Sequence, residues 1–335
     1  MGTAREAWAR LHGLFAVYKP PGMHWQMVRD TVETQLLKDL NSLKRPPPRQ
    51  EIRFLTSTIE GNARKELTIT ASRLPVLADH PLVAGPMFTH LNMGAVHRLD
   101  MKSSGVLVLG VGHGNKLLPY LYNTHPTKAY VVHGLFGKAT DDFSDTGKLI
   151  EKTTFDHITE EKLEQILAVI QGSNHKSLLM FSDIDLKTQE AYELAVKGLI
   201  RPMDKTPPLI TAIRCLQLTP PEFHLEIQCM NENQQYLRRL VHEIGLELKS
   251  SAVCTRIRRT RDGVFTVEDA LLRTQWNLQN VQNAIDESRH KVQTELEQTL
   301  SHWGMSADDE REVGVDQPVE NELTGDRGNF HQQPY

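Results

Sequence analysis

The sequence predicts an α+β fold, in which several strands form a sheet and helices pack against it. Short apolar runs rich in β-branched residues lie between glycines and prolines, which is typical of strands. These runs occupy residues 13–22 (ending in a Pro-Pro-Gly turn), 106–109, 127–134, 207–218, 222–230 and 252–260. Apolar residues at helical spacing predict helices. The helical segments are residues 26–38, 158–170 (with Gly172 as the stop), 189–199, 234–245 and 278–300.

The composition indicates a globular body followed by a polar end. With 335 residues and a mass of 38.0 kDa, the chain can bury one large core or two modest ones. A hydrophobic content of 39% is slightly low and predicts that part of the chain is unfolded. Residues 306–335 contain eight acidic and two basic residues, so the first 305 residues carry about +2 within a net charge of −4. This mildly basic body is compatible with an anionic partner.

Several classes of protein are excluded. The three cysteines, Cys215, Cys229 and Cys254, are too few and too far apart for a disulfide framework or a thiolate metal site. We expect buried thiols in a reducing compartment. No apolar run approaches the length of a membrane span, and no secretory signal is present. The glycine-rich residues 110–116 lack the P-loop spacing, which excludes that mode of nucleotide binding.

Three segments lie outside the predicted catalytic domain or interrupt its pattern. Residues 1–12 form an N-terminal extension that is either a weak amphipathic transit signal or the first turn of a helix. Residues 41–52 form a basic, proline-rich linker, and no definite structure is predicted from there to Thr89. At the other end, we expect a polar helix within 276–305 and a disordered acidic tail over 306–335.

Asp100 is the main candidate catalytic residue. It lies on a short loop before the apolar run 106–109, and a core strand behind a loop can hold a catalytic group in place. Arg98 gives this loop a cation, which favours an ionised carboxylate. Such a carboxylate can act as a nucleophile or general base. The alternative is that Asp100, before Ser-Ser-Gly, only closes a turn or caps a helix.

Four motifs, in this order, resemble the TruB family of pseudouridine synthases. They are KPPGM at 19–23, HRLDMKSSGVL at 97–107, KAY at 128–130 and YLRRLVHEIG at 236–245. The resemblance spans about residues 13–275. It implies the pseudouridine synthase fold, a large, mostly antiparallel mixed sheet flanked by helices and loops. It also implies isomerisation of uridine to pseudouridine in mRNA, tRNA or both, without a metal or cofactor.

The resemblance implies a role for each candidate site residue. Asp100 attacks the flipped-out base or its ribose, Tyr130 stacks on the base and helps to remove the C5 proton, and Arg238 keeps Asp100 ionised and oriented. Tyr236 and Ile257 line the pocket.

A second group of residues is predicted to bind the substrate through its charge. Lys19 has either a structural or a phosphate-binding role, and the arginines from 256 to 261 form either a solvated face or an RNA-contact face. Binding of the RNA backbone is therefore expected to depend on salt. The cations assigned to substrate binding, or expected to contribute to this dependence, are Lys19, Arg98, Lys102, Arg256, Arg258 and Arg259.

Departures from the family pattern bear on substrate and location. Ala95 stands where the family usually has histidine, and residues 172–190 lack the family's prolines, which leaves substrate choice open. There is no room for the RNA-binding PUA domain of bacterial members. The chain therefore resembles the mitochondrial members that lack this domain, which implies a monomer in the mitochondrial matrix. Mitochondrial RNA-processing or ribosome-assembly proteins are the expected protein partners.

Two other functions remain open from sequence. The altered segment 172–190 suggests an RNA-binding or RNA-folding module that has lost turnover, and the acidic tail suggests a scaffold. No short motif encodes the target uridine, because single-stranded loops are recognised by shape and stacking.

Overall fold

The computed structural model describes residues 3–61, 64–182, 188–196, 200 and 206–302, and the predicted disordered tail lies outside these ranges. The helices are α1 (Ala4–Ala9), α2 (Trp25–Ser42), α3 (Pro81–Ala84), α4 (Leu118–Asn123), α5 (Glu160–Phe181), α6 (Gln189–Val196), α7 (Gln234–Glu247) and α8 (Leu278–His302). The strands are β1 (Gly13–Lys19), β2 (Gln50–Gly61), β3 (Arg64–Pro75), β4 (Met93–Ala95), β5 (Ser104–Val111), β6 (Lys128–Phe136), β7 (Lys138–Thr140), β8 (Leu149–Lys152), β9 (Leu209–Thr219), β10 (Glu222–Met230), β11 (Ala252–Asp262) and β12 (Phe265–Thr266).

One eight-stranded sheet organises the described chain. Its strand order is β1-β5-β11-β6-β10-β9, with β4 beside β5 and β12 beside β11. Only the pairing of β5 with β11 is parallel among these strands, so the sheet is mixed and mostly antiparallel. This confirms the predicted fold class. The parallel pair joins the first residues of β5, Ser104 and Gly105, to Arg258 and Arg259 of β11. The loop before β5 therefore ends beside β11.

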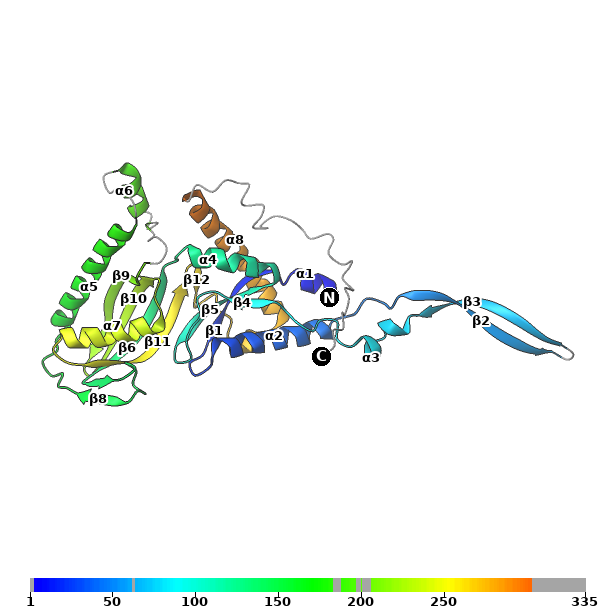
Figure 1. Ribbon diagram of the computed structural model, residues 1–335, viewed down its shortest axis with the longest axis horizontal. Helices are drawn as coiled ribbons and strands as arrows, with labels where there is room; N and C mark the ends of the chain where they lie inside the picture. The colour runs from blue at the N-terminus through cyan, green and yellow to red at the C-terminus, as the bar shows by residue number, and fades with distance from the viewer. Residues whose placement is uncertain (1–2, 62–63, 183–187, 197–199, 201–205, 303–335) are drawn as a thin grey trace, which may run out of the picture.

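Helices cover the two halves of the sheet separately (Figure 1). The helices α5 and α7 contribute Leu163, Leu167 and Leu240 to a core that also contains residues of β6, β9, β10 and β11. The helices α2 and α8 contribute Val28 and Ile285 to a second core beside β1, β4 and β5. The loop that carries Asp100 lies between these halves.

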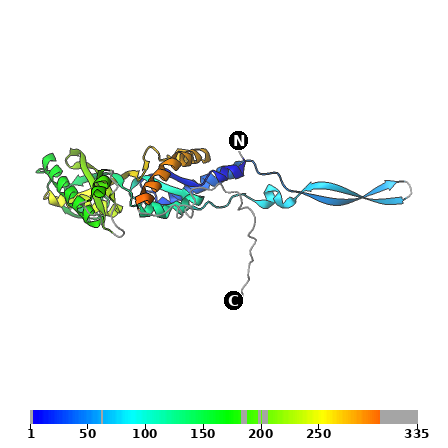
Figure 2. The same cartoon turned by 90° about the horizontal axis from the view of Figure 1, so that it is seen from above.

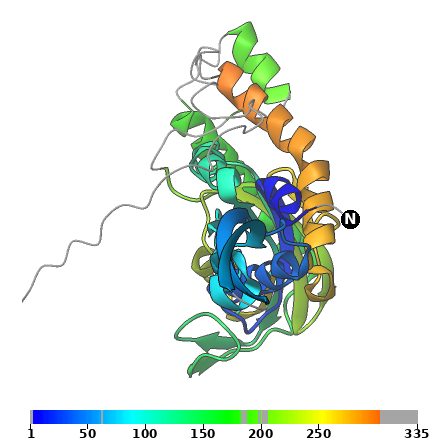
Figure 3. The ribbon, with the colours of Figure 1, turned by 90° about the vertical axis from the view of Figure 1, so that its right-hand side faces the viewer.

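Both ends of the described chain pack on the second half. Leu11, just after α1, is buried, and the amide of Gln282 on α8 donates a hydrogen bond to the Ala7 carbonyl at 2.9 Å. Arg10 forms an ion pair with Asp286 at 2.7 Å. Figure 3 shows α8 running along the side of the body, next to α1. Residues 3–11 are thus built into the fold, as the helical alternative predicted.

The hairpin formed by β2 and β3 has no counterpart among the predicted elements. Its strands pair in register from Gln50 opposite Pro75 to Gly61 opposite Arg64, and they pair with no other described strand. The hairpin extends away from the body (Figure 2). Ile52 and Phe54 are exposed on it.

Two predictions about helices need correction. Gly172 is not a helix stop, because α5 continues through it to Phe181. The predicted polar helix at 278–300 is amphipathic, since Val281, Ile285 and Val292 are buried against the sheet. Within the described residues, every helix is too short or too polar to cross a membrane.

Candidate active site

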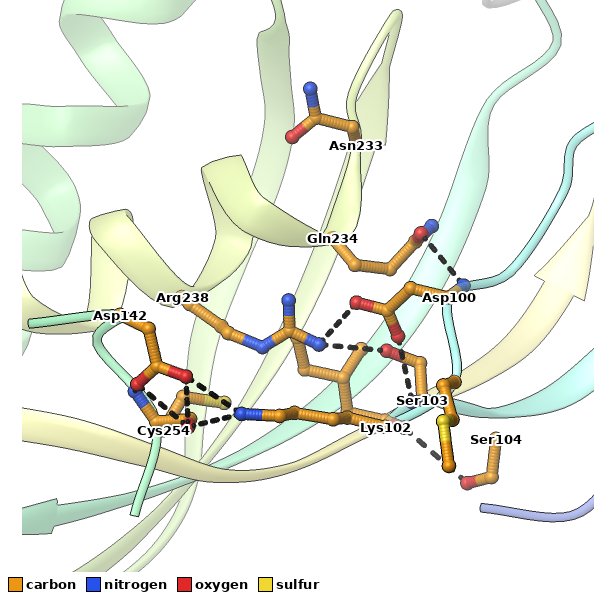
Figure 4. Close-up of polar contacts among 12 residues, drawn as sticks. Asp100, Lys102, Ser103, Ser104, Asp142, Asn233, Gln234, Arg238 and Cys254 are labelled. Carbon is orange, nitrogen blue, oxygen red and sulfur yellow. Dashed lines mark hydrogen bonds and ion pairs between the residues drawn. The ribbon is translucent and has the colours of Figure 1, made fainter. Parts of the chain in front are cut away.

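Asp100 lies on the loop before β5, and each oxygen of its carboxylate accepts a hydrogen bond (Figure 4). The Ser103 backbone N–H donates to Oδ1 at 2.8 Å, which closes a tight turn. The Arg238 guanidinium, from the first turns of α7, donates to Oδ2. The Asp100 backbone N–H donates to the side-chain oxygen of Gln234 at 3.2 Å. The loop and α7 thus orient the carboxylate jointly, and the predicted pairing of Arg238 with Asp100 is confirmed.

The electrostatics of this pair favour the charged carboxylate. Burial raises the pKa of Asp100, but the hydrogen bonds from Ser103 and Arg238 outweigh burial, so the pKa lies below its usual value. The Asp100 side chain keeps 35% of its surface exposed, whereas that of Arg238 keeps 11%. A substrate atom can therefore reach the carboxylate while the arginine remains packed behind it.

The motif KPPGM, at residues 19–23, donates hydrogen bonds to the backbone of the loop that carries Asp100. The Lys19 ammonium is fully buried and donates to the Ser103 carbonyl at 2.6 Å and to the Met101 carbonyl at 3.4 Å. The Gly22 backbone N–H donates to the same Met101 carbonyl at 2.8 Å. Burial lowers the pKa of Lys19 to about 8. The structural alternative for Lys19 is therefore correct, and the phosphate-binding alternative does not fit its burial.

Lys102 fastens the other side of the loop to the segment between β7 and β8. Its ammonium donates to Asp142 at 2.7 Å, to Ser144 at 2.8 Å and to Thr146 at 2.9 Å. About half of the Lys102 side chain is exposed, but its charge is shared with Asp142. The expected contact of Lys102 with an RNA phosphate would have to compete with these bonds.

Tyr130 lies on β6 in the buried cluster that also includes Leu99 and Ile257. Its ring has no exposed surface, so stacking on a base would require neighbouring side chains to move. Tyr236 is partly buried and packs against the same cluster. Burial raises the pKa of Tyr236 to about 12. Tyr130 and Ile257 therefore belong to the same buried cluster as Leu99, the residue before Asp100, and Tyr236 packs against that cluster.

The predicted cationic group is not a single RNA-binding face. Arg259 is fully buried and donates to the carbonyls of Val106 and His97, so it cannot contact a phosphate. The Arg98 guanidinium stacks over the Trp25 ring at 4.7 Å, and the cation paired with Asp100 comes from α7 instead. Arg258 is half-buried, with its guanidinium 5.6 Å from the ring centre of Tyr18.

Arg256 is the exposed member of the three arginines assigned to RNA on β11. Its neighbours along the strand alternate between the two faces of the sheet, which explains why the group divides. The sequence of an arginine run does not show which of its side chains point into the fold.

Sequence reasoning overlooked several residues that shape the site. Gln234 binds the loop backbone. The Asp262 carboxylate accepts a hydrogen bond from His97 Nδ1–H across 2.8 Å, and Glu232 accepts one from the Tyr130 hydroxyl. Ser103 completes the turn around Asp100. Of these, only Ser103 had a local signal, because a turn closed by an aspartate side chain needs a backbone N–H a few residues later.

The arrangement provides an ionised, accessible carboxylate that is fixed by hydrogen bonds and backed by a buried arginine. Such a group can attack an electrophilic carbon or remove a proton without reorganising in the transition state.

Comparison with known proteins agrees with this site. A family model described as "TruB family pseudouridylate synthase (N terminal domain)" matches residues 87–235, which include Asp100 and Tyr130. Over 301 residues the chain is 63% identical to "Pseudouridylate synthase TRUB2, mitochondrial" of Homo sapiens, covering 90% of each chain. It is 65% identical to the protein of the same name from Xenopus tropicalis, covering 85% of this chain and 87% of that one. "Pseudouridylate synthase TRUB1" of Mus musculus is 28% identical, over 85% of this chain and 73% of its own length.

Proposed function

The chain belongs to the TruB family of pseudouridylate synthases, and on this premise we propose that Asp100 is the nucleophile with which it converts uridine to pseudouridine in RNA. The enzyme is mitochondrial, as its close relatives are named. The observation that carries the proposal is the ion pair of Asp100 with Arg238, in which the carboxylate stays partly exposed.

The proposed reaction begins with a uridine swung out of its stack, which costs a few kcal/mol and least for a base in a loop. Asp100 attacks the base or ribose, the glycosidic bond breaks, and the uracil turns and rejoins the ribose through C5. Arg238 stabilises the carboxylate before attack, and the turn through Ser103 fixes its direction. Tyr130 then helps to remove the C5 proton.

The substrate and setting follow from the resemblance. We assign mRNA, tRNA or both as substrates, within the mitochondrial matrix, for a monomeric enzyme that needs no metal or organic cofactor. For the RNA backbone we assign the exposed Arg98 and Arg256 and exclude the fully buried Lys19 and Arg259. We assign Tyr236 and Ile257 to the wall of the substrate pocket, which is supported by their packing in or against the buried cluster that contains Tyr130.

The test replaces the carboxylate and leaves the shape of the side chain unchanged. Asp100→Asn should abolish tritium release from RNA labelled at uridine C5, while RNA affinity stays within about twofold, because the amide is a far weaker nucleophile. Asp30→Asn, on the exposed face of α2, is the matched control and should retain full activity. Retained tritium release in Asp100→Asn would end the assignment. Binding without turnover by the unaltered protein would instead support an RNA-binding module.

A further inference from the structure

Glu232 places a buried carboxylate directly against the hydroxyl of Tyr130. It lies in the short connection between β10 and α7, and its side chain is only 1% exposed. The Tyr130 hydroxyl donates to Oε1 of Glu232 at 2.6 Å. The Lys128 ammonium lies 3.2 Å from the same oxygen. No described catalytic step accounts for this carboxylate, although burying it is costly.

The surroundings keep the phenol neutral and the carboxylate paired. Burial first, and the charge of Glu232 second, raise the pKa of Tyr130 well above its usual value. The other titratable groups that interact with Glu232 are Lys128, Cys229 and Arg259. Since Tyr130 is neutral, its hydroxyl oxygen can take up a proton only if its own proton leaves at the same time.

We propose that Glu232 is the proton acceptor and positioning residue of Tyr130 during removal of the C5 proton. The inference rests on the proposed function, because it requires the step in which Tyr130 deprotonates C5. It extends that function by giving the proton a destination and by assigning a role to a residue outside the four motifs.

After the new C5–C1′ bond has formed, the C5–H bond breaks and its electron pair forms the C5–C6 double bond of the uracil. If Asp100 attacked the ribose, the C6–N1 π pair moves to N1, which takes up a proton from water. If Asp100 attacked the base, the C6–O bond to Asp100 breaks and its electron pair returns to the carboxylate. The proton moves to the Tyr130 oxygen while the phenolic proton moves to Oε1 of Glu232, so Tyr130 remains neutral throughout. Glu232 later returns its proton to solvent when the product leaves. The Lys128 ammonium, 3.2 Å from Oε1, pairs with the carboxylate again once this proton has left.

The test replaces Glu232 by an isosteric group that accepts a hydrogen bond but not a proton. Glu232→Gln should lower kcat about 100-fold, with KM for RNA unchanged, because a positioned proton acceptor typically contributes this much. If C5 deprotonation has become slow, deuterium at uridine C5 should slow Glu232→Gln at least twofold more than it slows the unaltered enzyme. A purely structural role would not produce this isotope effect.

The controls separate chemistry from folding. Glu226→Gln removes a carboxylate that pairs with Arg214. Glu226 precedes Ile227, the strand partner of Tyr130, so its side chain points to the opposite face of the sheet, and this variant should leave kcat and the isotope effect unchanged. Tyr130→Phe should match Glu232→Gln, and the double variant should be no slower than either, because the two groups act as one unit. Circular dichroism shows whether Glu232→Gln folds. If it does not, the isotope effect is measured on the double variant Lys128→Met/Glu232→Gln, which removes both charges of the ion pair.

An isotope effect equal to that of the unaltered enzyme, or strictly additive losses in the double variant, would overturn the proposal. Failure of the underlying function looks different. If Asp100→Asn keeps its turnover, the nucleophile assignment is wrong whatever Glu232→Gln does. If Asp100→Asn is inactive and Glu232→Gln has full activity, only the role of Glu232 is lost.

Discussion

At the scale of single residues, the site depends on which hydrogen-bond donor each oxygen of the Asp100 carboxylate meets. Oδ1 of Asp100 closes a turn with the Ser103 N–H, and Oδ2 meets the Arg238 guanidinium. Asp100 therefore closes a turn with one oxygen and presents a charged carboxylate with the other, so the turn alternative and the catalytic alternative are compatible. Burial alone would favour the protonated acid, so the charged form depends on the donors around it.

This balance predicts a change in pH dependence when the arginine is removed. In Arg238→Gln the pKa of Asp100 should rise, because burial persists while the hydrogen bond and opposite charge of Arg238 are lost. The ionised nucleophile is then lost at a higher pH as the solution is acidified. We expect the acid limb of the rate profile for pseudouridine formation to move upward in pH, with activity best preserved at alkaline pH.

Single-turnover rates from pH 4 to pH 8 measure this shift. Arg239→Gln is the matched control, because that neighbouring arginine is exposed and pairs with Glu243. Its profile should coincide with that of the unaltered enzyme. An unmoved acid limb in Arg238→Gln would show that Arg238 does not control the ionisation of Asp100.

The resemblance to the TruB family predicted the charged pair of Asp100 with Arg238, but it did not predict the burial of the other cations. Asp100 and Arg238 were identified because their motifs each mark one functional position. Lys19 and Arg259 also stand in or near motifs, yet their charges support backbone carbonyls inside the fold. A basic residue that binds phosphate and one that binds a carbonyl have the same sequence signal, so only the three-dimensional packing separates them.

At the scale of secondary structure, the parallel contact of β5 with β11 fixes the loop that carries Asp100. Arg258 lies opposite Ser104, and Arg259 lies opposite Gly105. Gly105 has a φ of +116°, and a Cβ at this position would lie 2.1 Å from the Arg259 carbonyl oxygen. The close approach of the two strands therefore requires glycine.

Two glycine substitutions should have opposite effects on stability. Gly105→Ala should destabilise the fold by about 3 kcal/mol, since both backbone strain and a clash oppose the new methyl group. Gly172→Ala should stabilise it by about 0.5 to 1 kcal/mol, because Gly172 lies within helix α5 and a Cβ there meets no atom within 4 Å. Urea unfolding of both variants measures these changes. Equal stabilities would mean that the β5–β11 contact tolerates a side chain.

Periodicity predicted the elements that have one buried face. The strand Glu222–Met230 alternates between buried and half-exposed residues, and α7 buries its apolar stripe, so both matched their predicted ranges closely. The hairpin of β2 and β3 was missed for the converse reason. Ile52 and Phe54 are exposed there, and a ribbon without a covered face gives no polar-apolar alternation to detect.

At the scale of the whole molecule, the hairpin and α1 differ sharply in how they join the body. The hairpin strands form hydrogen bonds with each other and extend outward (Figure 2). The N-terminal helix, in contrast, brings Ala4 and Leu11 into contact with the core and links to α8 through Arg10. Sequence patterns did not distinguish these cases, because residues 1–12 fitted either a transit signal or a helical turn and most of the hairpin lay in a segment with no predicted structure.

Removing these two segments should therefore affect stability unequally. Replacing residues 50–75 by a short glycine-serine linker should change Tm by less than about 2 °C, since little buried surface is lost from the body. Deleting residues 3–11 should lower Tm by more than about 5 °C, because it exposes the site of Leu11 and removes the ion pair with Asp286. Thermal unfolding followed by circular dichroism compares the variants with the full chain. A large loss of stability on removing the hairpin would reveal contacts between it and the body, whereas an unchanged Tm without residues 3–11 would mean that α1 is dispensable to the fold.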